Sequence, residues 1–107
     1  QPIFEAFMTP LKSLGVTTLS PRSVGGTDHL AFDNAGLPGF QFIQDPIEYD
    51  SRTHHSDQDT FERLIAEDLT KNAAIVASFV YLTANRDEPL PRKPLPRTLR
   101  PAGSPVP

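Results

Sequence analysis

The feature that most limits the fold of this chain is the density of proline after Asn85. Seven of the nineteen residues from 89 to 107 are proline, and four others are arginine or lysine. A segment of this composition cannot bury enough apolar surface to offset the entropy lost on ordering. We therefore expect residues 89–107 to form a basic tail that is extended or disordered unless it docks, and residues 1–88 to form the folded part.

The folded part is small, and its composition excludes several classes of protein. The chain has 107 residues and no cysteine, so a disulfide framework, a cysteine-based zinc finger and a thiol nucleophile are all excluded. No apolar run approaches the roughly 20 residues that span a bilayer, so we expect no transmembrane segment. Residues 1–88 carry a net charge of −7. Because nucleic-acid surfaces need clustered positive charge, this acidic body argues against a nucleic-acid partner.

Hydrophobic periodicity predicts three helices, over residues 2–14, 27–35 and 59–84. The first is expected to end at Gly15, and Pro10 inside it predicts a kink or an early end. The second is expected to end at Gly36. Asp59 and Glu62 have the spacing of a capping box, with Asp in place of the usual Ser or Thr, and predict that the third helix begins there.

Two short segments, residues 16–20 and 39–44, are predicted to be strands. The second has apolar side chains on both faces, with Phe40 and Phe42 on one and Ile43 on the other, which is typical of a buried strand in a parallel sheet. The order helix–strand–helix–strand–helix is half of an α/β sandwich. Two strands are too few for a stable parallel sheet, so partner strands are expected to precede Gln1.

From these features we expect the chain to be a fragment that begins within a longer protein. Its first residue is Gln1, and its only methionine, Met8, lies inside a predicted helix. The isolated chain is expected to be poorly folded, with Phe40, Phe42 and the apolar stripe of helix 59–84 more exposed than a core should be.

The strongest candidate for chemistry is the adjacent pair His54 and His55, which lies in the polar loop 45–58 and is followed by Ser56, Asp57 and Asp59. Imidazole is the commonest metal ligand, and open α/β sheets place their ligands in loops at the carboxyl ends of strands. The alternative is a pair of exposed histidines in a polar loop, with Asp59 capping a helix. Zinc sites need three or four ligands, so spacing alone leaves both interpretations open.

A second candidate follows Gly25 and Gly26, which let the backbone approach a ligand closely. Asp28 and His29 come directly after Thr27 and could orient a metal ligand. The alternative, a helix N-cap with one partly buried histidine, is favoured by these residues alone. A third set of polar residues shows no spacing that is typical of a functional site, and we interpret it as solvated surface. These residues are Asp45, Glu48, Tyr49 and Arg52.

Three segments together resemble the C-terminal part of the zinc-dependent M28 metallopeptidases. They are GGTDHLAF at 25–32, LPGFQFIQDP at 37–46 and THHSDQDTF at 53–61. The family consists of co-catalytic aminopeptidases and carboxypeptidases with a phosphorylase/hydrolase-like three-layer α/β/α sandwich. The resemblance covers roughly residues 1–88, and it implies that this chain is the C-terminal part of such a sandwich with a Pro-rich tail.

The resemblance also implies roles for individual residues. The last metal ligand of the family is a His followed by Ser or Thr and then by an Asp-Thr pair, a pattern that His55 fits with Ser56 and the pair at 59–60. His54 stands where the family often has a Tyr that steadies the oxyanion, a role a histidine could take as a donor. Asp28 matches an Asp that lies by the site, where it orients a ligand or contacts the substrate, and His29 is expected to pack beneath it.

The implied activity is hydrolysis of a peptide substrate by metal-activated water, with two zinc ions in the complete enzyme. The other ligands and a Glu general base would precede Gln1, so this chain would supply one ligand and part of the substrate pocket. By itself it is expected to be inactive. The family also implies a secreted or periplasmic location.

Two other functions stay open at this point. The chain could belong to a non-catalytic, receptor-like or scaffolding member of the same fold that has lost metal ligands. Alternatively, the Pro-rich tail could be the functional part, because Pro91 and Pro94 have the PxxP spacing that docks in aromatic grooves.

Overall fold

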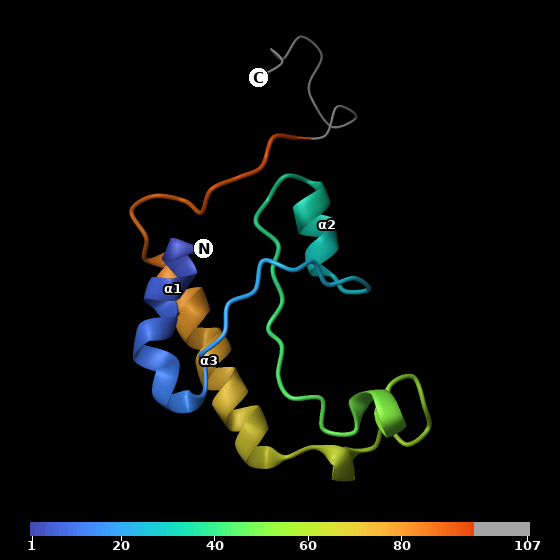
Figure 1. The fold of residues 1–107 in the computed structure, drawn as a ribbon. Helices are drawn as coiled ribbons and strands as arrows, with labels where there is room; N and C mark the ends of the chain where they lie inside the picture. Colours follow the sequence, from blue (N-terminus) through green and yellow to red (C-terminus); the bar gives the residue numbers. More distant parts are fainter. Residues whose placement is uncertain (96–107) are drawn as a thin grey trace. The chain divides into compact units, whose positions relative to one another are not determined.

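Helices make up the regular structure of residues 1–95, the part of the chain that the computed structural model describes (Figure 1). In chain order they are α1 (Pro2–Met8), a 3₁₀ helix (Thr9–Leu14), α2 (His29–Asn34), a π-helical turn (Tyr49–Thr53), a 3₁₀ turn (Phe61–Arg63) and α3 (Ala66–Ala84). The described residues divide into two units. The first unit comprises Gln1–Ser20 and Phe42–Asn85, and the second comprises Pro21–Gln41 and residues 86–95.

The predicted helix over residues 2–14 is confirmed, with its geometry changing where Pro10 enters. Pro10 has no N–H to donate to the carbonyl of Ala6, so the N–H of Thr9 bonds that carbonyl three residues back. The Thr9 hydroxyl then donates to the carbonyl of Glu5 at 3.1 Å, which replaces the α-helical bond that the Thr9 N–H no longer makes. The 3₁₀ helix ends at Gly15, whose φ of 88° is left-handed, as the sequence predicted.

The predicted helix over residues 27–35 is confirmed as α2, and Gly36 follows it with a φ of 81°. Asp28 stands at the N-cap position, but its side chain makes no capping hydrogen bond. The helix therefore begins without the side-chain cap that is usual at an Asp.

The third helix was predicted to begin at Asp59, and this was wrong. Leu64 and Ile65 are extended, with ψ of 135° and 110°, and α3 begins at Ala66. The capping-box interpretation falls with it. Glu67 and Asp68 occupy the first turn of α3, where negative charge is favoured by the positive end of the helix dipole.

Both predicted strands were wrong as well, and the α/β arrangement is not seen in residues 1–95, which are helical. Residues 16–20 and 39–44 form no β-ladder with another described segment (Figure 1). A strand needs a neighbour that accepts and donates its backbone hydrogen bonds, and residues 1–95 contain none. Part of the second segment instead runs along α3, where Phe42 contacts Phe79 and the side chain of Asn72 donates to Gln44.

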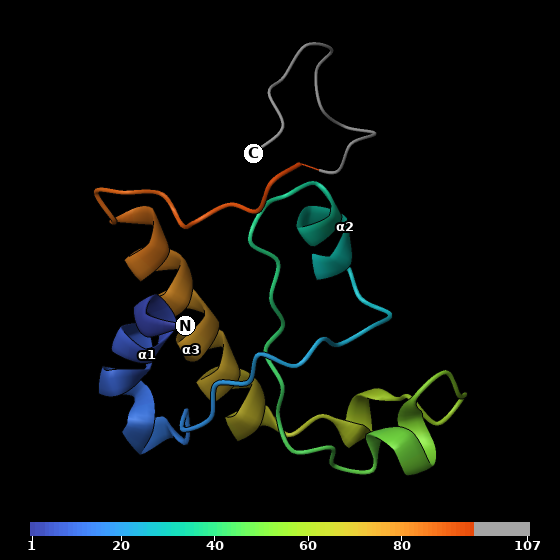
Figure 2. The same ribbon diagram turned by 45° about the horizontal axis from the view of Figure 1, so that its top comes forward.

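The core of the first unit is an aromatic cluster between α1 and α3, which lie side by side (Figures 1 and 2). The ring of Phe79 on α3 lies 5.8 Å from Phe4, 5.8 Å from Phe7 and 5.1 Å from Phe42, centroid to centroid. The contacts with Phe7 and Phe42 are edge-to-face, the geometry that aromatic pairs favour. The buried apolar residues are Phe7, Met8, Leu11, Ile75 and Phe79.

Most of the remaining apolar side chains are exposed, which confirms the predicted exposure in part, since Ile75 and Phe79 of the predicted stripe are buried. Phe61 is 83% exposed and Val80 is 63% exposed, and Phe40 and Phe42 are also exposed. On α3 the same holds for Leu69 and Val76. Only one face of α3 is therefore covered within the described residues.

In the second unit, the segment that follows α3 contacts the C-terminal end of α2. The backbone N–H of Lys93 donates to the carbonyl of Gly36 at 2.9 Å, and the Lys93 ammonium pairs with Asp33. Gly39 packs so closely that a Cβ placed there would lie 2.3 Å from the carbonyl oxygen of His29. The rest of the predicted tail, residues 96–107, lies outside the described residues.

The first prediction concerns the aromatic cluster. Phe79→Ala in the full-length protein should lower the free energy of unfolding by about 3 kcal/mol, because it removes a buried ring on which three others converge. Urea unfolding followed by circular dichroism measures this change. Val80→Ala, at an exposed position next to it, is the matched control and should stay within about 0.5 kcal/mol of wild type. Equal effects of the two variants would contradict a core centred on Phe79.

The second prediction concerns the close approach at Gly39. Gly39→Ala should destabilise the second unit by about 1–3 kcal/mol, because the new methyl group must displace the backbone of α2. Amide hydrogen exchange of α2 measures this loss. Gly25→Ala is the control, since a Cβ there meets nothing within 4 Å. Unchanged α2 exchange in Gly39→Ala would show that residue 39 does not pack against His29.

Candidate functional site

The two adjacent histidines lie on a loop whose backbone is closely hydrogen-bonded. The loop enters through a π-helical turn, Tyr49–Thr53, which is closed when the N–H of His54 donates to the carbonyl of Tyr49 at 2.9 Å. After His55 the hydroxyl of Ser56 donates to the carbonyl of Thr53 at 3.2 Å and to that of Arg52. Both sides of the histidine pair are thus anchored to the same turn.

The imidazoles of His54 and His55 lie against each other on the surface. Their ring centroids are 4.0 Å apart, and the ring of Tyr49 stacks on His54 at 4.6 Å with an interplanar angle of 27°. Both histidines are exposed. Neither imidazole forms a hydrogen bond with another group in residues 1–95, so their nitrogens can reach a ligand or a metal ion.

Three residues of this region have left-handed backbone conformations that non-glycine residues rarely adopt. The φ angles are 38° for Ile47, 57° for Glu48 and 54° for His55. The β-branched Ile47 is the most unusual of them. Such conformations cost free energy and persist only where surrounding contacts impose them, and they are concentrated at functional sites.

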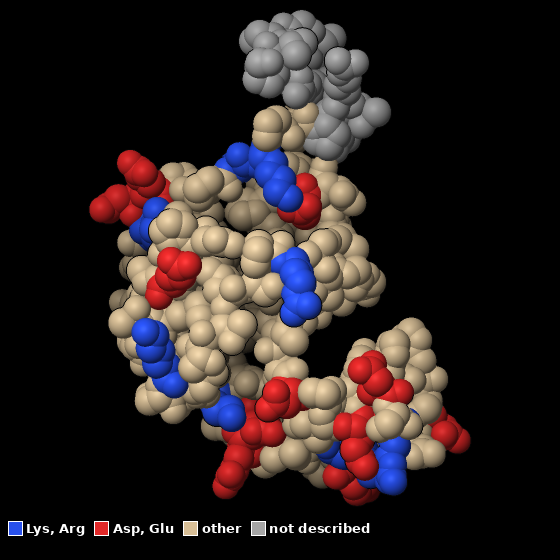
Figure 3. All heavy atoms as spheres, viewed as in Figure 1, with Lys and Arg blue, Asp and Glu red and all other residues tan. Residues whose placement is uncertain are grey.

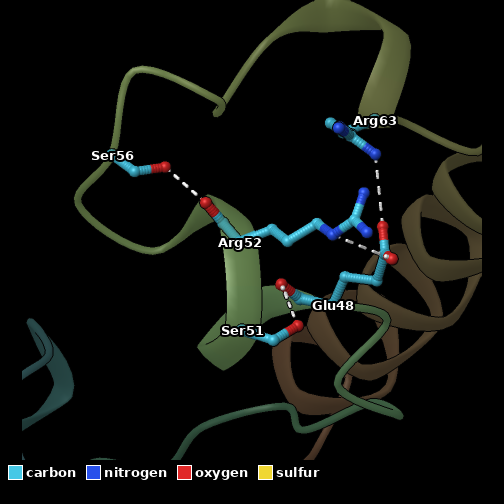
Figure 4. A network of polar contacts seen from close by, with 5 residues as sticks. All are labelled: Glu48, Ser51, Arg52, Ser56 and Arg63. Atoms are coloured by element: carbon cyan, nitrogen blue, oxygen red, sulfur yellow. Dashed lines mark hydrogen bonds and ion pairs between the residues drawn. The ribbon is translucent and has the colours of Figure 1, made fainter.

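Residues 48–63, which carry the two histidines and which we call the histidine loop, are joined at their ends by an ion pair, and a second pair lies within them (Figure 4). The carboxylate of Glu48 lies 3.4 Å from Nε of Arg52 and 3.2 Å from Nη1 of Arg63. Sequence reasoning missed this arrangement and treated Glu48 and Arg52 as solvated surface. Both are exposed, but their i,i+4 spacing was a signal that they could pair.

Acidic side chains gather over the loop that precedes α3, with arginines among them (Figure 3). The acidic residues between 45 and 62 are Asp45, Glu48, Asp50, Asp57, Asp59 and Glu62. They outnumber Arg52 and Arg63, so the loop has a net negative charge that favours the approach of a cation.

Glu62 forms its interactions with neighbouring residues of the chain. A hydrogen bond from its own backbone N–H, and then one from the Thr60 side chain, hold the pKa of Glu62 below its ordinary value. The charge of Arg63 acts in the same direction. A carboxylate with a lowered pKa accepts a proton less readily at neutral pH.

Asp28 and His29 belong to the second unit, whereas His54 and His55 belong to the first. His29 is half-buried, and its Nδ1 shares a hydrogen bond with the Thr27 hydroxyl, whose own proton is donated to Oε1 of Gln41 at 3.1 Å. Asp28 is exposed. His29 thus matches the simpler interpretation, a partly buried histidine at a helix start.

Residues 1–95 do not hold a complete metal site. Among these residues no three His, Cys, Asp or Glu side chains are close enough together to bind one metal ion. The imidazole of His55 is a suitable ligand for zinc. The described residues, however, supply only His55, or His55 together with His54, at this place. A shallow apolar groove between the 3₁₀ helix and α3 is lined by Leu14, Ala66, Glu67, Thr70, Lys71 and Ala74, and so contains no histidine.

The helices of residues 1–95 include none with both the length and the apolar character needed to cross a bilayer. Comparison with known proteins gave no match among curated proteins and none among solved structures. The model of Peptidase family M28, however, matches residues 2–80. This range includes α1, α2, the histidine loop and most of α3, which is well over half of the chain. The resemblance seen in the three sequence segments is thereby confirmed, and the chain belongs to peptidase family M28.

Proposed function

We propose that this chain is the C-terminal portion of a zinc-dependent exopeptidase that hydrolyses peptide bonds by metal-activated water. Membership of peptidase family M28 supports a peptide substrate. The observation that carries the proposal is the exposed histidine pair, which lies within the matched residues on a hydrogen-bonded loop. A secreted or periplasmic location is part of the same proposal and rests on the family alone.

In this proposal His55 is a zinc ligand. A neutral imidazole offers one nitrogen lone pair to a metal, and the ring of His55 is exposed and makes no hydrogen bond within residues 1–95. The backbone that follows it is fixed, because the hydroxyl of Ser56 also accepts the N–H of Gln58 at 3.2 Å. A ligand held in place by its backbone loses little entropy when a metal binds.

The remaining ligands must come from beyond the described residues, since these contain no complete donor set. We propose that the rest of the family domain supplies them, together with the glutamate that serves as general base. Two zinc ions are expected in the assembled site. The 107 residues alone should therefore be inactive.

Zinc, when bound in such a site, polarises the substrate carbonyl and lowers the pKa of a bound water. The contribution that we assign to His54 is a hydrogen bond to the carbonyl oxygen as negative charge develops on it. The stacking of Tyr49 on His54 restricts the orientation of this imidazole. A donor that is already oriented needs no reorganisation during the reaction.

Asp28 is assigned a supporting role beside the site, where it orients a ligand or contacts the peptide. Its carboxylate is exposed and is not used to cap α2, so it is available for such a contact. Whether Asp28 orients a metal ligand or contacts the peptide depends on where the second unit lies in the complete enzyme.

The third prediction tests the histidine pair in the full-length enzyme. His55→Ala should lose zinc from one of the two positions and lower activity by orders of magnitude, because catalytic zinc ions have few protein ligands. His54→Ala should keep its zinc and lower kcat, since one oxyanion donor contributes roughly 3 kcal/mol. Metal content of the purified variants and steady-state kinetics measure these effects.

His29→Asn is the matched control, because the amide N–H of Asn can replace Nδ1 as the partner of the Thr27 oxygen, and its zinc content should equal that of wild type. If His54→Ala loses zinc while His55→Ala keeps it, the assignment of the two histidines is reversed. If both keep it, the loop binds no zinc. The non-catalytic alternative would then be favoured.

A further inference from the structure

We propose that Glu48, through its ion pairs with Arg52 and Arg63, is a positioning residue that holds the histidine loop closed and fixes His55 for metal binding. The role toward metal rests on the proposed function, because it takes His55 as the ligand. The closure of the loop does not depend on that assignment and can be measured without metal.

The carboxylate of Glu48 spans the base of the loop. One oxygen, Oε2, accepts a hydrogen bond from Arg63 at 3.2 Å, although the two residues are fifteen positions apart. The other oxygen, Oε1, faces Nε of Arg52 at 3.4 Å. His54 and His55 lie between these anchor points in the sequence, so the segment that carries them is tied at both ends to one side chain (Figure 4).

The backbone of Glu48 organises the same region. Its carbonyl accepts the N–H of Arg52 at 2.9 Å and that of Thr53 at 3.3 Å, as well as the hydroxyl of Ser51 at 3.3 Å. These bonds form the π-helical turn that leads into the histidines. One residue thus fixes the start of the turn through its carbonyl and the end of the loop through its carboxylate.

The loop needs such contacts because nothing in it is buried. Within residues 45–60 only Thr53 is even half-buried, so apolar packing does not hold the loop. The left-handed conformations of Ile47, Glu48 and His55 add a local cost that contacts must offset. Closing a loop of this length also costs entropy. If the loop is open in the metal-free protein, this cost is subtracted from the free energy of metal binding. The Glu48 pairs offset part of this cost before the metal binds.

The experiment compares four variants of the full-length enzyme: Glu48→Gln, Arg63→Gln, Arg63→Lys and Lys71→Gln. Lys71 is the matched control, because it forms an exposed ion pair of 3.4 Å with Asp68 on α3, outside the loop. Two quantities are measured: amide hydrogen exchange of residues 49–60 in zinc-free protein, and the zinc dissociation constant from competition with a chelator.

Arg63→Gln should raise both loop exchange and the zinc dissociation constant by roughly twofold to fivefold, the range of one exposed ion pair. Glu48→Gln should have at least this effect, since it weakens both pairs. Arg63→Lys should keep loop exchange and the zinc dissociation constant close to their wild-type values, because lysine keeps the positive charge. Lys71→Gln should change neither quantity.

Unchanged loop exchange in Glu48→Gln and Arg63→Gln would overturn the proposal. It would also be overturned if His55→Ala loses zinc while Glu48→Gln binds zinc as tightly as wild type. If His54→Ala and His55→Ala both keep their zinc, it is the proposed function that fails. The exchange measurement in zinc-free protein then still decides whether Glu48 closes the loop.

Discussion

The packing of Phe79 against the aromatic residues of α1 is the contact on which the first unit depends. Phe4 and Phe7 meet Phe79 from α1, and Phe42 meets it from the segment that leads to the histidine loop. This one ring therefore connects the two ends of the unit's sequence. It also fixes α3, whose N-terminal side is where the loop rejoins the helix. The aromatic core and the histidine loop are thus parts of one connected arrangement, although the histidines themselves are exposed.

What could be predicted from the sequence was what depends on near neighbours. The first helix, its change at Pro10 and its end at Gly15 follow from missing donors and left-handed glycine, and the structure has all three. The strands failed because a strand is defined by its partner, which residues 1–95 do not contain. The start of α3 failed because Asp59 and Glu62 fit a local rule. The extended backbone at residues 64–65 separates them from the helix.

In the candidate site, too, some features could be predicted from the sequence and others could not. His54 and His55 were identified from their residue type and from the family pattern, and the structure places them exposed and in contact with each other. The roles of Glu48 and Arg63 were not foreseen, because their pairing joins positions fifteen residues apart. The positive φ of His55 could not be predicted either, because the residue type does not indicate this conformation as a glycine would. The sequence indicated which residues to propose for the chemistry, and the structure adds the ion pairs that lie beside them.

The two parts of the first unit are ordered by different forces, and this has a consequence for the family's chemistry. Apolar burial around Phe79 does not depend on attraction between charges, whereas exposed ion pairs such as those of Glu48 weaken as the ionic strength rises. The loop that carries the histidines can therefore open while the helices stay packed. In the proposed function, breaking the pairs weakens zinc binding severalfold and does not abolish it. In the proposed function metal binding favours the closed loop, so the metal and the Glu48 pairs would stabilise the same conformation.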